Sequence, residues 1–464
     1  MLFNSFVFLG AFLPITYLVF WSLSSARGRY IWLALTGYVF YGFWDPRFCL
    51  LMAFSTLVSY SAGRVLLDYR DPTTRKLALV IPVTVDLMLL GFFKYANFAF
   101  DTLAGFASIT GIHATFPHLN VILPVGISFY TFHTITYIVD AYRGVIRPTR
   151  NLFEFAAYVS LFSQLVAGPI VRFRQIEADL ENIESANRTR WLPQGVSIFV
   201  IGLVEKVVVA DSLASVVDPA LASYSTLSTA GTWLAMLGYT FQLYFDFCGY
   251  SDMAVGLGFM FGLRIPWNFN SPYKATDPSD FWKRWHISLS SCLRDYLYIP
   301  LGGNRRGVPR MYANLMVTML LGGLWHGANW TFVIWGAFHG AMLVAYRVFG
   351  KQWDGLPTLV RRSVMFVLVV VGWVFFRAGS IQMATSLLRS MFSPTAGGMV
   401  PHSFPFVVML ALAALWAVAA PNAREINERL VWRPAYGFVL APAFGAVLAI
   451  MIAGGTSPFL YFQF

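Results

Sequence analysis

The sequence predicts an all-α, polytopic membrane protein whose residues 1–464 form a single integral-membrane domain. Three observations support this prediction. Charged residues make up 12% of the chain, against about 25% in ordinary soluble domains. Hydrophobic residues make up 57% and the mean hydropathy is +0.61. Long apolar stretches follow one another along the whole chain. This composition excludes a water-soluble enzyme and a DNA-binding protein.

The apolar stretches predict about 11–13 transmembrane or re-entrant helices, because a helix needs about 20 apolar residues to cross a bilayer. Strands do not fit, since residues 364–376 are apolar on every side. Asp86 faces either a cavity or a neighbouring helix. Pro and Gly at 124–126 and 249–262 predict broken helices, which exist at membrane depth only beside protein or a water-filled cavity. The stretches lie at residues 2–22, 30–45, 48–66, 77–99, 119–142, 153–170, 192–212, 226–246, 312–348, 361–377, 404–421 and 436–455.

The chain carries 33 Lys and Arg against 22 Asp and Glu, and most of the basic residues lie in short connections. Basic connections favour the cytoplasmic side and anionic lipid, so we expect the N-terminus outside and the loop at 70–76 inside. The connections at 143–150 and 172–190 are both basic, so segment 153–170 is predicted to dip into the membrane and return. The three cysteines are widely spaced and indicate neither a CxxC metal site nor a disulfide framework.

One interval, residues 262–311, is polar for this chain and holds eight basic and three acidic residues. Residues 277–289 begin with Asp-Pro and predict an interfacial helix. His286 points towards its apolar stripe, which an ionisable ring does only for a reason. The plain alternative is a lipid-binding surface helix with a structural histidine. The stripe consists of Trp282, Trp285, Leu289, Leu293 and Tyr296.

A second histidine, His326, lies between the two halves of the apolar stretch 312–348, with glycines on both sides. This pattern indicates a helix brought close to a substrate or another backbone, although a neutral core histidine would also fit. His339 follows 13 residues later, a rotation of roughly 220°, so one straight helix cannot present both rings on one face. We therefore expect no metal site. The remaining histidines, His113, His118, His133 and His402, are interpreted as structural.

Motif searches exclude several reaction classes. The chain has no GxSxG nucleophile elbow, no GxxxxGK[ST] phosphate loop, no GxGxxG after a strand and no HExxH. The residues five positions after His286 and His326 are Ser291 and Thr331, so the His-x4-Asp pattern of other acyltransferases is absent as well. Serine-based covalent catalysis, nucleotide hydrolysis and zinc hydrolysis therefore lose their support.

Three motifs resemble the membrane-bound O-acyltransferases, in particular the branch of bacterial alginate O-acetyltransferases. They are FWKRWHISL at 281–289, LRDYLYIPLGGN at 293–304 and GLWHGANW at 323–330. The resemblance departs at Cys248, where a serine is expected, and at Cys292, where an aromatic residue is expected. Supporting segments lie at 123–129, 167–172, 244–253, 372–378 and 461–464.

The resemblance implies a fold of helices around a central tunnel, with His326 as the catalytic residue and His286 in the same site. A neutral imidazole can take the proton of a hydroxyl acceptor. The negative charge that then develops on a thioester oxygen could be stabilised by His286, Asn304, Asn329 or a backbone N–H. The further residues predicted to bind donor or support the site are Trp285, Arg284, Ser288, Arg294, Asp295, Trp325 and Asp246.

The sequence thus predicts a bacterial inner-membrane O-acetyltransferase. It would take acetyl from a cytoplasmic thioester, acetyl-CoA or another acyl thioester, and deliver it across the membrane to an extracytoplasmic polysaccharide such as alginate. No permanently bound cofactor is expected. The expected partners are membrane lipid, the acyl donor, the polysaccharide and a separate periplasmic acetyltransferase. Alternatives are acylation of peptidoglycan, cellulose or teichoic acid, or a non-enzymatic transporter or scaffold in polysaccharide secretion.

Overall fold

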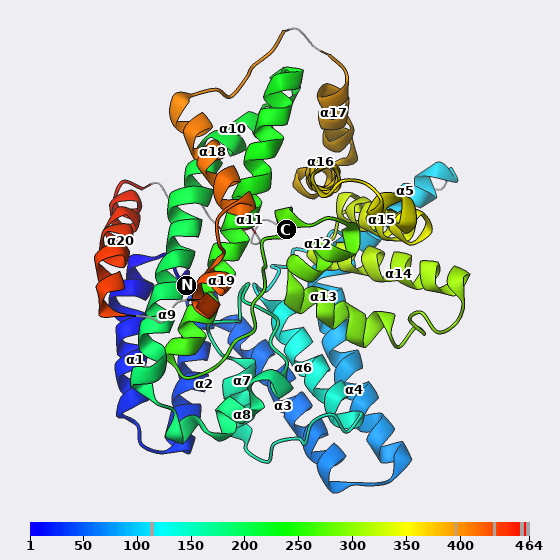
Figure 1. The fold of residues 1–464 in the computed structure, drawn as a ribbon. Helices are drawn as coiled ribbons and strands as arrows, with labels where there is room; N and C mark the ends of the chain where they lie inside the picture. The colour runs from blue at the N-terminus through cyan, green and yellow to red at the C-terminus, as the bar shows by residue number, and fades with distance from the viewer. Residues whose placement is uncertain (112–115, 395–396, 430–432, 455–458, 461–464) are drawn as a thin grey trace. The chain divides into compact units, whose positions relative to one another are not determined.

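The computed structural model describes the whole chain except residues 112–115, 395–396, 430–432, 455–458 and 461–464 (Figure 1). Within this described part every regular element is a helix, and the β-bridge between Leu227 and Met399 is isolated. The all-α prediction is therefore confirmed. His113 and the resembling segment at 461–464 lie outside the described residues. The described chain separates into two compact units, Met1–Gly195 with Leu257–Pro266 and Val196–Gly256 with Trp267–Phe464.

The first unit is a helical bundle in which α3, α4 and α6 pack against one another and α2 packs on α7. Asp71 caps α4 by accepting a hydrogen bond from the N–H of Thr74, and Pro72 occupies the first turn. The helices are α1 (Leu13–Ser22), α2 (Ala26–Gly42), α3 (Arg47–Asp68), α4 (Pro72–Leu90), α5 (Ala96–Ile109), α6 (Ile127–Tyr142), α7 (Leu152–Val159), α8 (Phe173–Glu181) and the start of α9 (Arg188–Leu203).

Asp86, the acidic residue inside an apolar stretch, joins three helices of this unit. Its Oδ1 accepts a hydrogen bond of 2.7 Å from Ser55 on α3, and its Oδ2 accepts one of 2.6 Å from Thr134 on α6. Of the two alternatives for Asp86, the contact with neighbouring helices is thus the one observed. Both oxygens are paired, which offsets the cost of burying the carboxyl group.

The second unit contains the long helix α11 and the hairpin formed by α14 and α15, whose positions Figure 1 shows in green and yellow. A π-helical segment at Val204–Ala210 joins α9 to α10. The helices of this unit are α10 (Asp211–Ala222), α11 (Thr229–Met260), α12 (Pro278–Arg284), α13 (Ile287–Leu293), α14 (Val308–His326), α15 (Trp330–Asp354), α16 (Thr358–Arg377), α17 (Ile381–Phe392), α18 (Phe404–Val418), α19 (Ala423–Arg429) and α20 (Gly437–Ile452).

Among the described residues, four helical stretches are long and apolar enough to cross a membrane on their own. A fifth span arises if α18 and α19, which are bent by 50°, form one crossing. The total of 11–13 counts shorter and bent helices as well and stays a prediction, as does the tunnel. The four stretches are Arg47–Asp68, Pro72–Ile109, Trp330–Asp354 and Thr358–Arg377.

One predicted helix interruption is confirmed and one is wrong. Residues 124–126 are not helical, because Gly126 takes a left-handed φ of 76° before α6 begins. Segment 153–170 forms no continuous helix, since α7 ends at Val159, and its return to the same side of the membrane stays a prediction. The predicted break at 249–262 is wrong, because α11 runs to Met260. Its glycine at 249 serves helix packing instead: a Cβ there would lie 2.6 Å from the carbonyl oxygen of Gly202.

Candidate active site

His326 lies at the end of α14, where this helix turns back into α15. Glycines allow the two helices to approach: a Cβ on Gly323 would lie 2.2 Å from the carbonyl oxygen of Phe332, and one on Gly336 would lie 2.3 Å from that of Met319. The sequence interpretation of a close backbone approach around His326 is therefore confirmed. The helix ends because Gly327 is extended, and the side chain of Asn329 then caps α15 by accepting from the N–H of Thr331.

His286 lies at a break between two short helices. Asp277 caps α12 as expected, accepting from the N–H of Asp280. The single interfacial helix predicted through this region is nevertheless wrong, because α12 ends at Arg284 and His286 takes left-handed angles of φ 43° and ψ 55°. Such angles are uncommon outside glycine and cost of order 1–3 kcal/mol. The break turns the imidazole into the protein, where it is fully buried.

The backbone of segment 268–270 holds this break in place. The N–H of Ile287 donates to the carbonyl oxygen of Asn268 at 2.9 Å, and the N–H of Asn270 donates to the carbonyl oxygen of Arg284 at 2.9 Å. The guanidinium of Arg284 donates to the Asn270 carbonyl at 3.2 Å and to Asp280 at 2.8 Å. Arg284, predicted as a site residue, is thus placed where it fastens the segment next to His286.

Asn268 orients the His286 ring. Its Oδ1 lies 3.0 Å from His286 Nδ1 and accepts hydrogen bonds from Ser288, from the hydroxyl at 2.9 Å and from the backbone N–H at 3.2 Å. Its Nδ2 donates to Ser251 on α11 at 3.1 Å. The backbone N–H of Ser288 can only donate, so it fixes the oxygen end of the amide towards the ring. An Oδ1 acceptor assigns the ring proton to Nδ1, so the neutral ring carries its lone pair on Nε2. Sequence reasoning predicted Ser288 but missed Asn268.

The two predicted histidines come together. The ring centres of His286 and His326 lie 6.2 Å apart. His326 is 4% exposed. Trp325 lies beside both rings, with ring centres 6.0 Å from His286 and 5.0 Å from His326. The packing of α12–α13 against the α14–α15 hairpin therefore creates one buried site from motifs about 40 residues apart in sequence.

Aromatic side chains enclose this pair. Phe247 of α11 packs edge-on against His286, with 4.7 Å between the ring centres. Trp335 and Phe376 pack against His326, with 5.1 and 5.3 Å between the ring centres. Trp285 is buried as well, and its ring centre lies 4.8 Å from that of Trp373. A low-dielectric surrounding of this kind keeps a histidine neutral and strengthens hydrogen bonds made within it.

His339 lies on the neighbouring helix, in an aromatic cluster. Its ring is 4.7 Å from that of Trp335, which separates it from His326. The two histidines thus contact one tryptophan and lie on different helices, so they do not form a shared pair of ligands on one helical face. His339 is 1% exposed.

Three further predicted residues lie in structural contacts away from the imidazole pair. Asn329, besides capping α15, donates to the carbonyl oxygen of Gly379 at 3.0 Å. Asp246 binds the buried ammonium of Lys206 and accepts from the N–H of Leu460 at 3.0 Å. Asn304 accepts a hydrogen bond from the hydroxyl of Tyr298. Their proposed parts in binding or catalysis stay predictions.

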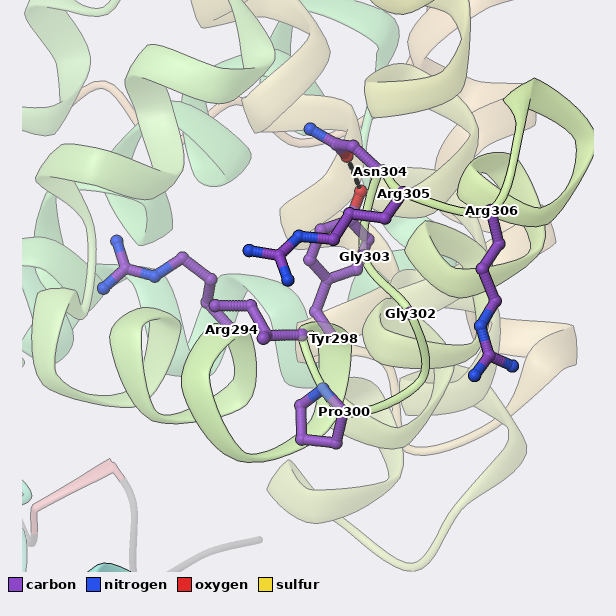
Figure 2. Close-up of a pocket in the computed structure, with 9 residues that line it drawn as sticks. Arg294, Tyr298, Pro300, Gly302, Gly303, Asn304, Arg305 and Arg306 are labelled. Atoms are coloured by element: carbon purple, nitrogen blue, oxygen red, sulfur yellow. Dashed lines mark hydrogen bonds between the residues drawn. The ribbon is translucent and has the colours of Figure 1, made fainter. Parts of the chain in front are cut away.

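A basic cavity of about 510 Å³ lies at the end of the α13 segment. Figure 2 shows the side chains of Arg294 and Arg305 extending to the left of the view, while that of Arg306 lies at the right and points downward. Asp295 pairs with Arg294 at 2.7 Å. The loop that shapes the cavity needs glycine, because Gly302 and Gly303 have φ values of 113° and 52°.

A second cavity, of about 320 Å³, adjoins the first and shares Arg294 and Tyr298 with it. Part of its wall is apolar, formed by Trp282, Ile287 and Met319, and the positive charge of Lys283 lies beside them. Ile287 directly follows His286 in the chain. The two cavities together offer cationic groups at one end and an apolar wall close to the helices that carry the histidines at the other.

Comparison with known proteins identifies the family of this chain. A model of the membrane-bound O-acyltransferase family matches residues 127–391, which contain both histidines. The probable alginate O-acetylase AlgI of Azotobacter vinelandii is 47% identical over 85% of this chain and 78% of its own length. A peptidoglycan O-acetyltransferase of Helicobacter pylori is 37% identical over 84% of this chain and 80% of its own length.

A more distant relative broadens the reaction class. The teichoic acid D-alanyltransferase of Bacillus subtilis is 28% identical over 56% of this chain and 68% of its own length. These relatives carry acyl transfer in their names, and the helices described above are those of a multi-pass membrane protein. The chain therefore belongs to the membrane-bound O-acyltransferase family and is an O-acyltransferase of the membrane.

Proposed function

We propose that this protein transfers an acetyl group from a cytoplasmic thioester, acetyl-CoA, towards an extracytoplasmic polysaccharide, with His326 as catalytic base and His286 in the same site. The observation that carries the proposal is the approach of the two buried rings to 6.2 Å between motifs distant in sequence. Buried ionisable rings at membrane depth are costly, and two of them side by side are typical of a functional site.

One base is enough for the proton transfers of this reaction. A neutral His326 takes the proton of the acceptor hydroxyl while the oxygen attacks the thioester carbonyl carbon. The carbon–sulfur bond then breaks, the acetyl group stays on the oxygen, and the proton passes from His326 to the departing thiolate. General-base assistance of this kind typically contributes 10²–10⁴-fold to a rate.

The orientation of His286 narrows its part in this reaction. With its proton on Nδ1 and directed at Asn268, the neutral ring presents an acceptor at Nε2. It is therefore suited to accept a hydrogen bond from the attacking hydroxyl or from the N–H of His326. An acceptor does not stabilise a developing oxyanion, so that task falls to a donor, either a backbone N–H or an asparagine amide.

The two adjoining cavities support a nucleotide thioester as donor. Arg294 and Arg305, whose side chains extend in one direction, would bind phosphate groups, for which the guanidinium fork is well shaped. The apolar wall of the second cavity would receive the uncharged arm that carries the thioester. In this reading acetyl-CoA is a substrate, and the reaction needs no permanently bound cofactor.

The acceptor is proposed from the named activities of the relatives. Alginate fits best, because the relatives named alginate O-acetylase are 45–47% identical over 85% of the chain. Peptidoglycan is the second candidate, supported by the 37% identical relative. We place the protein in the bacterial inner membrane, with a periplasmic acetyltransferase completing the transfer onto sugar hydroxyls.

The test is a pair of histidine variants. His326→Ala should abolish release of free CoA from acetyl-CoA by purified protein and abolish polymer acetylation in cells. His402→Ala is the matched control, because His402 is exposed and contacts the backbone of Val400. Unchanged polymer acetylation with folded His326→Ala protein would overturn the mechanism and favour a scaffold or a transporter.

A further inference from the structure

Apart from the histidines, the second unit holds a compact group of three potential metal ligands. Glu205, Cys248 and Asp252 each direct one ligand atom to a common place, and these atoms lie within 4.8 Å of one another. All three residues are buried, with exposures of 1%, 1% and 3%. Among the described residues this is the group of histidine, cysteine and acidic side chains that meets that distance.

Local structure brings the three side chains together. Cys248 and Asp252 lie one turn apart on α11, and the sulfur is 3.7 Å from Asp252 Oδ2. Glu205 comes from the π-helical segment Val204–Ala210, a wider turn that is frequent at functional sites. Gly202 and Gly249 let the two helices touch backbone to backbone, so that Glu205 reaches the thiol without a side chain in between.

The buried carboxyl groups near this site outnumber the neighbouring ammonium group. Lys206 is the neighbouring cation, and its ammonium already binds Asp211 at 2.7 Å and Asp246. Asp211 and Asp246 thus share this ammonium, whereas no salt bridge in the described part of the chain joins the buried carboxyl groups of Glu205 and Asp252 to a cation. A buried negative charge is costly unless a cation or a proton compensates it.

One oxygen of the group also lacks a donor. Glu205 Oε2 is buried and accepts no hydrogen bond from any group in the part of the chain that the structure describes. An acceptor of this kind beside a thiol and a second carboxylate is what a bound metal ion satisfies, because carboxylate oxygen and thiolate sulfur are both ligands.

We propose that Glu205, Cys248 and Asp252 bind a divalent metal ion of the zinc class. A thiolate with two carboxylates suits Zn²⁺ better than Mg²⁺ or Ca²⁺, which prefer all-oxygen sites. The thiol would lose its proton on binding, leaving three negative ligands around a doubly charged ion. The ion has no part in acyl transfer, since neither of the two site histidines belongs to the group.

The position of the site gives it a consequence for the rest of the unit. The same turns of α11 carry Phe247, which packs on His286, and Ser251, which binds Asn268. A metal ion that joins α11 to the π-helical segment Val204–Ala210 would fix the position of α11 along its axis and its rotation about that axis. It would thereby hold the parts that orient His286.

The decisive measurement uses the full chain with Cys49→Ser and Cys292→Ser, so that Cys248 is the remaining thiol of the three. Purified in detergent without chelator, this protein should contain about one zinc per chain by elemental analysis. Exchange for Co²⁺ should produce a near-ultraviolet sulfur-to-cobalt charge-transfer band. Absence of both metal and band overturns the proposal and indicates that the two carboxyl groups share a proton.

A matched pair of variants locates the ligand. Cys248→Ser should lose at least about tenfold in metal affinity, by analogy with the effect of weaker ligand changes. Cys292→Ser, which removes an equally buried thiol on α13, should keep its metal. Equal metal content in the two variants overturns the proposal. If Cys248→Ser does not fold, the band of the protein with a single thiol still decides.

Discussion

At the scale of the residue, the site depends on an asparagine that fixes one histidine. Asn268 is fully buried, and its single oxygen serves Nδ1 of His286 together with both polar groups of Ser288. The sequence motifs pointed to both histidines but not to Asn268, because an asparagine in the segment Trp-Asn-Phe-Asn has the composition of an ordinary loop. The feature that could have identified Asn268 is a polar side chain between two aromatic residues in the basic interval 262–311.

Replacing Asn268 tests this arrangement. Asn268→Leu removes the acceptor that holds the imidazole in place. A displacement of the ring by about 1 Å should lower kcat on the order of 100-fold. Asn268→Asp keeps an oxygen acceptor for Nδ1–H and should retain more activity than Asn268→Leu. Initial rates with acetyl-CoA, compared at equal amounts of folded protein, check the order. Equal loss in both variants would contradict an orienting role and indicate a purely structural one.

The basic cavity gives a second test at this scale. Arg305→Gln should raise the KM for acetyl-CoA about tenfold and leave kcat nearly unchanged, because a charge-assisted hydrogen bond to phosphate contributes roughly 1.5–3 kcal/mol. Arg310→Gln is the matched control, since Arg310 is exposed in the same basic interval but does not line the cavity. Similar KM values for the two variants would remove the cavity from donor binding.

At the scale of the element, the helix ends explain where sequence prediction succeeded and where it did not. Caps and prolines located the start of α12, but nothing in the residue pattern marks its end at Arg284, since Trp285 and Leu289 continue the apolar stripe. Backbone hydrogen bonds with segment 268–270 impose the break, and a local residue pattern cannot reveal this segment because it is distant in sequence. Conversely, the glycines of α11 suggested a break, whereas tertiary packing keeps the helix continuous.

The crossing of α14 and α15 should be sensitive to a single methyl group. Gly323→Ala would place a Cβ 2.2 Å from the carbonyl oxygen of Phe332, and the backbones would have to separate. Overpacking of this kind costs typically 1–3 kcal/mol, so thermal stability should fall by several degrees. Gly350→Ala on α15 is the control, because its nearest atom is 3.8 Å away. A thermal unfolding curve in detergent compares the two.

At the scale of the whole molecule, composition was enough to predict an all-α membrane protein. Low charge and long apolar stretches determine the class, because only satisfied backbones can cross a bilayer. The number of crossings was beyond this reasoning, since α7 and the α18–α19 pair show that an apolar stretch can be short or bent. The division into two compact units was also not readable, because no polar linker marks their boundary.

The orientation of the whole chain in the membrane can be tested at the loop 70–76. The positive-inside rule places the loop at 70–76 in the cytoplasm. In a Cys49→Ser background, Thr73→Cys introduces an exposed thiol at this loop, while Cys248 and Cys292 are buried. A membrane-impermeant maleimide should label it in inverted vesicles and not in intact cells. Labelling in intact cells would reverse the assignment and with it the cytoplasmic side proposed for the donor.

The left-handed backbone at His286 determines which substitutions are informative there. Alanine would have to occupy the same strained angles while losing the ring, so a loss of activity would combine a folding defect with the loss of the imidazole. Asparagine tolerates these angles far better than alanine, and glycine adopts them freely. Genetic screens that rely on alanine would thus overstate the chemical contribution of this position, whereas His286→Asn and His286→Gly separate the ring from the turn that presents it.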